Sequence, residues 1–332
     1  MKKFGLEFVP MEYPLKTVLY AQLAERENFD YLWITDHYNN RNVYVILSSI
    51  ALNTNRIRFG PGVTNPYLIH PVITAQIIAS LNELAPNRIM LGIGAGDKAT
   101  LDMILGDRPK PLESIREAVT IIRSLLTENR VEFSGKAFNV KSARFNFKVE
   151  GKIPIFIGAQ GPKMLELASS MGDGVLVNFS HPLDFERAMS SIKKGLEMVN
   201  KSIENLEVVA ATSLSLDEDE KKAYKAAIPA VSFIVAGASE EILTSHNIDL
   251  DKAKAIREAL IKAKWKDAFS NVSEDMVDAF SIAGKPNKVI ERLSELFKLG
   301  VNTVIAGTPI GPNVKNSIEL LSRKVMTYFK AS

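Results

Sequence analysis

The sequence predicts an α/β fold of the (β/α)8 TIM-barrel class. Eight hydrophobic runs alternate with stretches of helical period along the 332 residues, which is the strand and helix count of such a barrel. Three of these runs are followed at once by strings rich in glycine, carboxylate and amide side chains, at 35–40, 60–67 and 94–100. In barrels of this class the carboxyl ends of the strands carry the chemistry. The pattern therefore predicts an enzyme.

The predicted elements follow from short hydrophobic runs for strands and from apolar residues at helical spacing for helices. The expected strands are 3–9, 30–35, 57–62, 89–93, 155–158, 174–177, 207–216 and 303–306. The expected helices are 15–28, 43–54, 71–84, 112–126, 162–171, 183–200, 286–299 and 313–329. A doubly wound open sheet is the alternative, but no GxGxxG string is followed by an acidic residue at the distance that fold requires.

Two stretches interrupt the alternation. Residues 131–140 carry alternating apolar residues around Ser134-Gly135-Lys136, which predicts a hairpin. Residues 217–280 are too long for one crossover and predict a helical insertion. We therefore expect a single barrel domain over 1–332 with insertions near 128–150 and 217–280.

Composition narrows the possible functions. The chain has 46% hydrophobic and 24% charged residues, which is typical of a globular protein. Its net charge is +3, and Lys and Arg are scattered among Asp and Glu, so we expect no nucleic-acid partner. The absence of cysteine excludes disulfides and thiolate chemistry, and four histidines without HExxH spacing predict no metal site. Charged and proline residues follow the first three residues, and no run is long enough to cross a membrane, so we expect a cytoplasmic protein with no membrane partner.

Three carboxylates are the candidate catalytic groups. Glu7 lies within the first expected strand, where it either points into the barrel mouth, with a pKa raised by burial, or is solvated near the strand end. Asp36 follows the second strand, where it is either a mouth carboxylate or the acceptor of a local turn. Asp97 follows the Gly94-Ala95-Gly96 string, which is either a weak phosphate cradle or a tight strand-to-helix turn; a carboxylate there favours contact with a polar ring edge.

Glycine-rich loops are the candidate cofactor sites. Gly62 and Val63 end the third strand, where backbone can form a wall for a flat ring. The string 158–162 begins a helix with Pro162 in its first turn, and the backbone N–H groups of a helix start can bind a cofactor phosphate. The string 306–312 follows the last strand and is similar, but its prolines restrict the number of free donors.

Taken in order, five strings resemble those of the coenzyme F420-dependent methylenetetrahydromethanopterin reductases of methanogenic archaea, a family within the bacterial-luciferase-like superfamily of (β/α)8 proteins. The matching strings span nearly the whole chain: 34–40, 60–67, 92–100, 157–162 and 309–312. One departure lies at 236–242, where Ser239-Glu240-Glu241 stands in place of the family's small residues and prolines.

The resemblance implies reduced F420, a deazaflavin co-substrate, donating a hydride to the methylene carbon of a tetrahydromethanopterin derivative. It implies that acids equivalent to Glu7, Asp36 and Asp97 surround the site, and that a cis non-prolyl peptide at Gly62–Val63 backs the deazaflavin. By position, the implied cofactor-binding residues are Asp36, Gly62, Val63, Thr64, Ala95, Gly96, Thr100, Gln160, Gly161 and Met164. The implied assembly is a homo-oligomer, a dimer or tetramer.

The mechanism we expect is direct hydride transfer in a ternary complex, in one-carbon metabolism during methanogenesis from CO2 or its reverse. One acid is kept protonated to donate a proton to a ring nitrogen, and an ionised acid stabilises the passing cation. Glu7 is the expected acid or pterin anchor, with Asp36 and Asp97 as electrostatic partners. Two alternatives remain at this point: an FMN-dependent luciferase-like monooxygenase and a non-catalytic flavin-binding barrel.

Overall fold

The computed structural model describes residues 2–106 and 110–331, and the chain divides into two compact units. The first unit comprises Gly5–Asn178 and Ala188–Val209. The second unit contains the other described residues, namely those up to Phe4, 179–187 and those from Ala210 onward. Strands β1 (Lys3–Phe8) and β9 (Glu207–Leu216) pass from one unit into the other. Each unit is described by itself below.

The first unit is built on parallel strands. They are β1, β2 (Tyr31–Ile34), β3 (Arg58–Pro61), β4 (Leu91–Ile93), β7 (Ile155–Ala159) and β8 (Gly174–Val177). Parallel ladders join β1 to β2, β2 to β3, β4 to β7 and β7 to β8. Isolated parallel bridges, Phe59 to Ile89 and Thr64 to Ile93, connect the third strand with the fourth. The spatial order is therefore β1-β2-β3-β4-β7-β8, with the carboxyl ends of all six strands at one edge.

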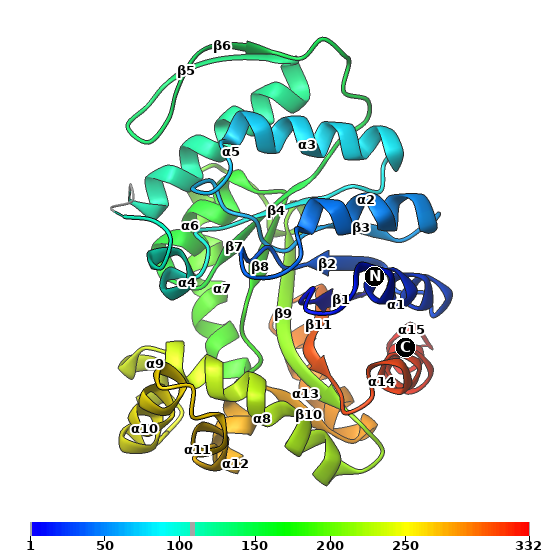
Figure 1. The fold of residues 1–332 in the computed structure, drawn as a ribbon, viewed down its shortest axis with the longest axis vertical. Coiled ribbons are helices and arrows are strands. Elements are labelled where there is room, and N and C mark those ends of the chain that lie inside the picture. The colour runs from blue at the N-terminus through cyan, green and yellow to red at the C-terminus, as the bar shows by residue number, and fades with distance from the viewer. Residues whose placement is uncertain (1, 107–109, 332) are drawn as a thin grey trace. The chain divides into compact units, whose positions relative to one another are not determined.

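Helices connect these strands (Figure 1). They are α1 (Pro14–Arg26), α2 (Val43–Asn53), α3 (Pro71–Leu84), α4 (Lys98–Asp102), α5 (Pro111–Glu128), α6 (Pro162–Met171) and α7 (Pro182–Glu197), with a short 3-10 turn η1 (Ile203–Asn205) before β9. Capping side chains and prolines explain where several of these helices begin. The Asn42 side chain accepts hydrogen bonds from the N–H groups of Tyr44 and Val45, and α1, α3, α5 and α6 each begin with proline, whose fixed φ suits the first helical turn.

The second unit combines three strands with a helical group. Strand β10 (Ile282–Gly284) is parallel to β9, and the hydroxyl of Thr212 on β9 donates to the Ile305 carbonyl of β11 (Thr303–Ile310) at 3.0 Å. The insertion helices pack on one another (yellow to orange in Figure 1) around buried Val231, Ile256 and Met276. They are α8 (Glu220–Gly237), α9 (Glu240–Ser245), α10 (Leu250–Ile261), α11 (Trp265–Ser270) and α12 (Glu274–Phe280).

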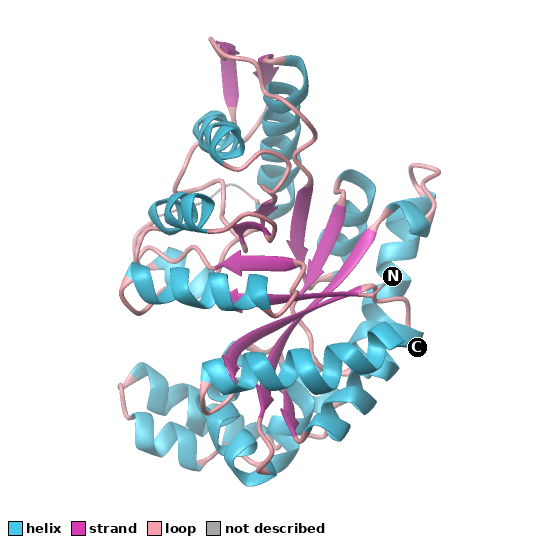
Figure 2. Cartoon of the chain, turned by 90° about the vertical axis from the view of Figure 1, so that its right-hand side faces the viewer, coloured by secondary structure: helices cyan, strands magenta, loops and turns pink. Residues whose placement is uncertain are grey.

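The chain then continues with α13 (Pro286–Lys298) and, after β11, with α14 (Val314–Leu320), the π-helical turn η2 (Leu321–Met326) and α15 (Thr327–Ala331). In both units the helices run along the outer side of the strands (Figure 2). No helix in the described ranges is both long and apolar enough to cross a membrane.

All eight predicted strands are present, with helices between them, so the (β/α)8 alternation is confirmed. The predicted helices 71–84 and 162–171 are found with the expected ends, and the insertion 217–280 is helical. Two short elements were not predicted, β10 and α4, because three and five residues are too few to show a period. At 236–242, α8 ends and the Ser239 hydroxyl caps α9, which gives this departure a structural reason. The single-domain organisation remains a prediction.

The predicted hairpin is also present, as β5 (Arg130–Ser134) paired with β6 (Asn139–Arg144). The Glu117 carboxylate on α5 anchors its turn by accepting hydrogen bonds from the N–H groups of Lys136, Ala137 and Phe138 at 2.8–2.9 Å. A Cβ at Gly135 would lie 2.3 Å from this carboxylate, so a larger residue there would displace the Glu117 side chain. Burial would raise the pKa of Glu117, but the three N–H groups hold it below its usual range.

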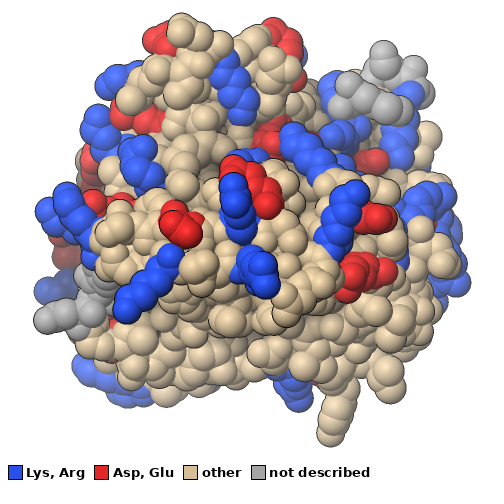
Figure 3. Space-filling model, turned by 90° about the horizontal axis from the view of Figure 1, so that it is seen from above, with Lys and Arg blue, Asp and Glu red and all other residues tan. Residues whose placement is uncertain are grey.

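On the face seen in Figure 3, Lys and Arg alternate with Asp and Glu and form no extended patch of one sign.

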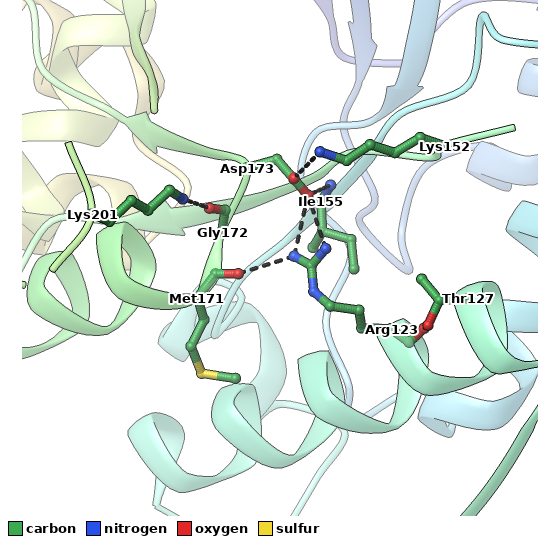
Figure 4. A network of polar contacts seen from close by, with 8 residues as sticks. All are labelled: Arg123, Thr127, Lys152, Ile155, Met171, Gly172, Asp173 and Lys201. Carbon is green, nitrogen blue, oxygen red and sulfur yellow. Dashed lines mark hydrogen bonds and ion pairs between the residues drawn. The ribbon is translucent and has the colours of Figure 1, made fainter. Parts of the chain in front are cut away.

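A polar network closes the amino ends of β7 and β8 (Figure 4). The Asp173 carboxylate accepts the Ile155 N–H at 3.0 Å, both terminal nitrogens of Arg123 at 3.2 Å and Lys152 Nζ at 2.8 Å. Arg123 also donates to the Met171 carbonyl at 2.9 Å, which joins α5 to the end of α6. Burial would raise the pKa of Asp173, but its N–H and cationic neighbours hold it below the usual range. This edge of the strands is therefore an electrostatic clamp between helices and sheet.

We expect Asp173→Asn to lower the free energy of unfolding by about 2 kcal/mol at pH 7, because Arg123 and Lys152 lose their ionised acceptor. A carboxyl with a depressed pKa stabilises the fold above its unfolded-state pKa and loses this effect as pH falls, so the difference should shrink below about pH 4. Urea unfolding at several pH values measures it. Glu128→Gln, at an exposed carboxylate at the end of α5, is the control. An equal loss at pH 7 and pH 3 would contradict the electrostatic explanation.

Candidate active site

Every candidate site residue belongs to the first unit and lies in or just beyond a parallel strand. Glu7 lies in β1, and Asp36 lies two residues beyond β2. The other candidates follow β3, β4 and β7, in the segments 62–64, 95–100 and 160–164. Because the carboxyl ends of neighbouring parallel strands meet at one edge, the structure brings these segments to the same edge of the sheet.

The floor of this edge is the indole of Trp33 on β2, which is only 1% exposed. Its ring packs edge-to-face against Phe156 of β7, with ring centroids 5.3 Å apart. Glycines on the neighbouring strands leave the space that the indole occupies. A Cβ at Gly62 would lie 2.7 Å from the Trp33 Cβ, and a Cβ at Gly92 would lie 3.0 Å from the indole ring. The indole Nε1 is buried and has no hydrogen-bond partner among the residues that the structure describes.

Glu7 points to the same side of the sheet as Trp33. Its neighbour Phe8 stacks on Tyr20 of α1, with ring centroids 5.4 Å apart, so Phe8 faces the helices. Since side chains alternate along a strand, Glu7 faces the other side, and it is in register with Trp33 on β2. The carboxyl is half-buried and has no hydrogen bond or ion pair to another described residue. Burial raises the pKa of Glu7 to about 7, so this acid is partly protonated near neutral pH.

Asp36 lies at the end of a chain of hydroxyl groups. The Thr64 hydroxyl donates to Asp36 Oδ2 at 2.7 Å, and the Tyr44 hydroxyl donates to Thr64 Oγ1 at 3.2 Å. Asp36 is half-buried; burial raises its pKa, while the Thr64 hydrogen bond and the neighbouring His37 oppose the rise. Sequence reasoning missed Tyr44. The available signal was a tyrosine in the first turn of the helix that directly follows the Asp36 loop.

The peptide bond between Gly62 and Val63 is cis, as the resemblance implies. Backbone hydrogen bonds hold this segment between two strands: Gly62 N–H donates to the Ile34 carbonyl at 2.8 Å, and Thr64 N–H to the Gly92 carbonyl at 2.9 Å. The Val63 side chain fits against glycines. A Cβ at Gly94 would lie 2.9 Å from one of its methyl groups, and a Cβ at Gly158 would lie 3.2 Å from the other. Backbone and one small side chain therefore form the wall at this position.

Asp97 has a structural role that the sequence left open. It is exposed, and its Oδ1 accepts the Thr100 N–H at 2.7 Å, so it is the N-cap of α4. Gly96 before it has a φ of 70°, which favours glycine. No contact joins Asp97 to Glu7 or Asp36 among the described residues, and its catalytic role stays a prediction.

The segment after β7 presents open donors. Gln160 is exposed and donates to the Asn178 carbonyl at 3.2 Å. Gly161 is the N-cap of α6, and a Cβ there would meet no atom within 4 Å. Because Pro162 has no N–H, the first free donors of this helix are the N–H groups of Lys163 and Met164. The loop 306–312, which was expected to be similar, belongs to the second unit and is largely the end of β11.

Comparison with known proteins identifies the family of the chain. The model of the luciferase-like monooxygenase family matches residues 10–303. A 5,10-methylenetetrahydromethanopterin reductase of Archaeoglobus fulgidus is 49% identical over 99% of this chain and 100% of its own. The chain belongs to the luciferase-like family, within its methylenetetrahydromethanopterin reductases.

Two further relatives cover nearly the full length. The 5,10-methylenetetrahydromethanopterin reductase of Methanopyrus kandleri is 40% identical over 98% of both chains. The structure of the coenzyme F420-dependent tetrahydromethanopterin reductase from the same organism matches with a TM-score of 0.94 over 99% of both chains, at 40% identity. An F420-dependent secondary alcohol dehydrogenase, 19% identical with a TM-score of 0.78, shares the fold. The predicted luciferase-like (β/α)8 class and the resemblance to the reductase family are confirmed.

We expect Glu7→Gln to make this luciferase-like protein more stable at alkaline pH. The folded state favours the protonated carboxyl, so wild-type stability falls as pH rises from 4.5 to about 7, a difference of about 3 kcal/mol. Glutamine cannot ionise, so the variant should match the wild type at pH 4.5 and exceed it above pH 7. Urea unfolding across this range tests the sign, with Glu128→Gln as control. Equal stabilities at pH 8 would show that Glu7 is solvated.

Proposed function

We propose that this protein is a reductase that transfers a hydride from reduced coenzyme F420 to methylenetetrahydromethanopterin, yielding the methyl derivative. The observation that carries the proposal is the full-length likeness to reductases of this name, 49% identical in one case and with a TM-score of 0.94 to an F420-dependent enzyme in another. The location of Glu7, Asp36 and the segments after β3, β4 and β7 at one edge of the sheet supports the proposal. The described residues contain no group of three His, Cys, Asp or Glu that could hold a metal ion.

The residues at this edge fit a planar cofactor with a phosphate. The wall at Gly62–Val63 is backbone and a valine, flanked by the Cβ-free positions Gly94 and Gly158. The open space at Gly161 leaves the first turn of α6 accessible, and the N–H groups of a helix start bind anions. We propose that Asp36, Thr64, Ala95, Gly96, Thr100, Gln160 and Met164 complete the cofactor site.

When bound, reduced F420 supplies the hydride. The protein must orient two flat rings, provide a proton and stabilise a cation. Glu7 suits the second task, because a carboxyl with a pKa of about 7 is partly protonated near neutrality and can give its proton to the ring nitrogen as the methylene bridge opens. We assign the third to Asp36, because the hydrogen bond from Thr64 supports its ionised form against the effect of burial, and an ionised carboxylate would stabilise the iminium ion. We propose Asp97 as a more distant electrostatic partner.

We propose further that the protein works in the cytoplasm of an archaeon, in the one-carbon metabolism of methanogenesis or its reverse, as a homo-oligomer. The reductases it resembles come from Archaeoglobus fulgidus and Methanopyrus kandleri, among others. Helices α1 and α2 pack together and expose apolar side chains: Leu15 is 74% exposed, Leu19 63% and Leu52 72%. Exposed apolar groups of this kind favour a contact between subunits.

The proposed activity is tested by anaerobic photometry of reduced F420. We expect its oxidation to require both the protein and methylenetetrahydromethanopterin, and the purified protein to lack a tightly bound yellow flavin. Omission of the pterin and omission of the protein are the controls. Bound FMN, with oxygen consumption and no pterin-dependent oxidation of F420, would favour a monooxygenase instead.

In the same assay we expect Glu7→Gln to reduce turnover by at least about 100-fold, because glutamine cannot donate the proton. The dissociation constant for F420, measured by fluorescence, should stay within about twofold, since Glu7 is assigned to the pterin side. Glu12→Gln, at an exposed carboxylate four residues before Lys16, is the matched control. Near-normal turnover in Glu7→Gln would remove Glu7 from the mechanism.

A further inference from the structure

Tyr44 is a buried phenol for which the reaction above has no use. It lies in the first turn of α2 and is 8% exposed. Its hydroxyl reaches Thr64 Oγ1 at 3.2 Å, and Thr64 reaches Asp36 Oδ2 at 2.7 Å, so three polar groups from α2, the segment after β3 and the loop after β2 form one chain. The Tyr44 hydroxyl also interacts with Thr74 of α3.

When Asp36 is ionised, the number of available protons fixes which group donates each hydrogen bond in this row of polar groups. A carboxylate accepts hydrogen bonds only, so the Thr64 hydroxyl must donate its single proton to the hydrogen bond with Asp36. The oxygen of Thr64 is then an acceptor, and Tyr44 must be the donor. Protonated Asp36 has no such need for a donor, so the arrangement favours the ionised carboxylate.

The middle member of the chain is held rigidly. Thr64 is fully buried, and its backbone is hydrogen-bonded on both sides, to the Gly92 carbonyl at 2.9 Å and from the Gly94 N–H at 2.9 Å. Its β-branched side chain has few rotamers. The hydroxyl proton can still rotate about the C–O bond. The hydrogen bond to Asp36 directs this proton, and the hydrogen bond from Tyr44 occupies a lone pair on the other side of the oxygen and so adds to this restriction.

We propose that Tyr44 is a positioning residue for the reductase reaction, which directs the Thr64 hydroxyl at Asp36 and thereby keeps Asp36 ionised and oriented. The inference rests on the proposed function, because Asp36 matters only if it faces the cationic intermediate. Tyr44 acts through Thr64 and contacts no substrate itself. The groups that bear on Asp36 are Thr64 and His37, and Tyr44 is in turn influenced by Asp36 and Thr74.

The direct test is titration of the Asp36 carboxyl by 13C NMR in the cofactor-free protein, with Asp36→Asn to assign the signal. Removal of the Tyr44 hydroxyl in Tyr44→Phe should raise the Asp36 midpoint, because hydrogen bonding to the charged form lowers a pKa and this support is weakened. Thr64→Val, which removes the direct donor, should raise it further, and Thr64→Ser should restore it. Tyr20→Phe, which removes a phenol on α1, is the matched control.

The kinetic consequence is a split between turnover and binding. In Tyr44→Phe we expect kcat at pH 7 to fall about fivefold, the value of one ordinary hydrogen bond, with KM for reduced F420 within twofold. The acidic limb of the pH–kcat profile should move to higher pH, since Asp36 would lose its charge sooner as pH falls. Thermal melting checks that the variants are folded. A residue with a merely structural role would lower stability without moving this limb.

The outcomes separate the two proposals. Wild-type protein without pterin-dependent oxidation of F420 would overturn the proposed function. An Asp36 midpoint that is the same in wild type and Tyr44→Phe would overturn the role of Tyr44, whatever the activity. A midpoint that rises in Tyr44→Phe and rises further in Thr64→Val, with Tyr20→Phe unchanged, would support it.

Discussion

The buried indole of Trp33 is the constraint from which the candidate site follows. An indole inside a parallel sheet needs space that the neighbouring strands can give only by lacking side chains, and Gly62 and Gly92 provide that space. Trp33 is the register partner of Glu7 on β1, so the two side chains lie on the same side of the sheet. Desolvation is the cause of the raised pKa of Glu7, so the acidity of this group follows from burial at a packed strand edge.

The two edges of the same strands show how environment decides what a carboxylate does. Asp173 at the amino ends is surrounded by Arg123, Lys152 and a backbone N–H, which lower its pKa and make it a clamp. Asp36, beyond the carboxyl end of β2, accepts a hydrogen bond from the Thr64 hydroxyl and lies near His37, and burial raises its pKa. The ion pairs of Asp173 therefore commit this carboxylate to stabilising the fold. The charge of Asp36 remains available to a ligand.

The sequence predicts the strands well because strands buried on both faces read as unbroken hydrophobic runs, and proline at 71 and 162 marks helix starts. It also places Glu7 within the first strand and Asp36 just beyond the second, where the structure has them. It cannot show that Asp97 caps α4, because a helix of five residues leaves no periodic trace. It misses Tyr44 because its link to Asp36 passes through Thr64, twenty-eight residues from Asp36 along the chain, and depends on a contact rather than on a pattern.

The proposed proton donor, Glu7, must be protonated at a pH at which the proposed cation stabiliser, Asp36, is ionised. The packing gives the two carboxyls different surroundings. Glu7 has lost water and gained no hydrogen bond from another described residue, so its neutral form is favoured. Asp36 has also lost water, but it gains a donor whose own oxygen is occupied by Tyr44, so its ionised form keeps support. A pair of carboxyls whose surroundings push their pKa values apart is a common route to acid and base roles in one site. Here burial raises the pKa of both groups, and the Thr64 hydroxyl and His37 oppose the rise at Asp36 alone, so the two carboxyls respond differently to the same loss of water.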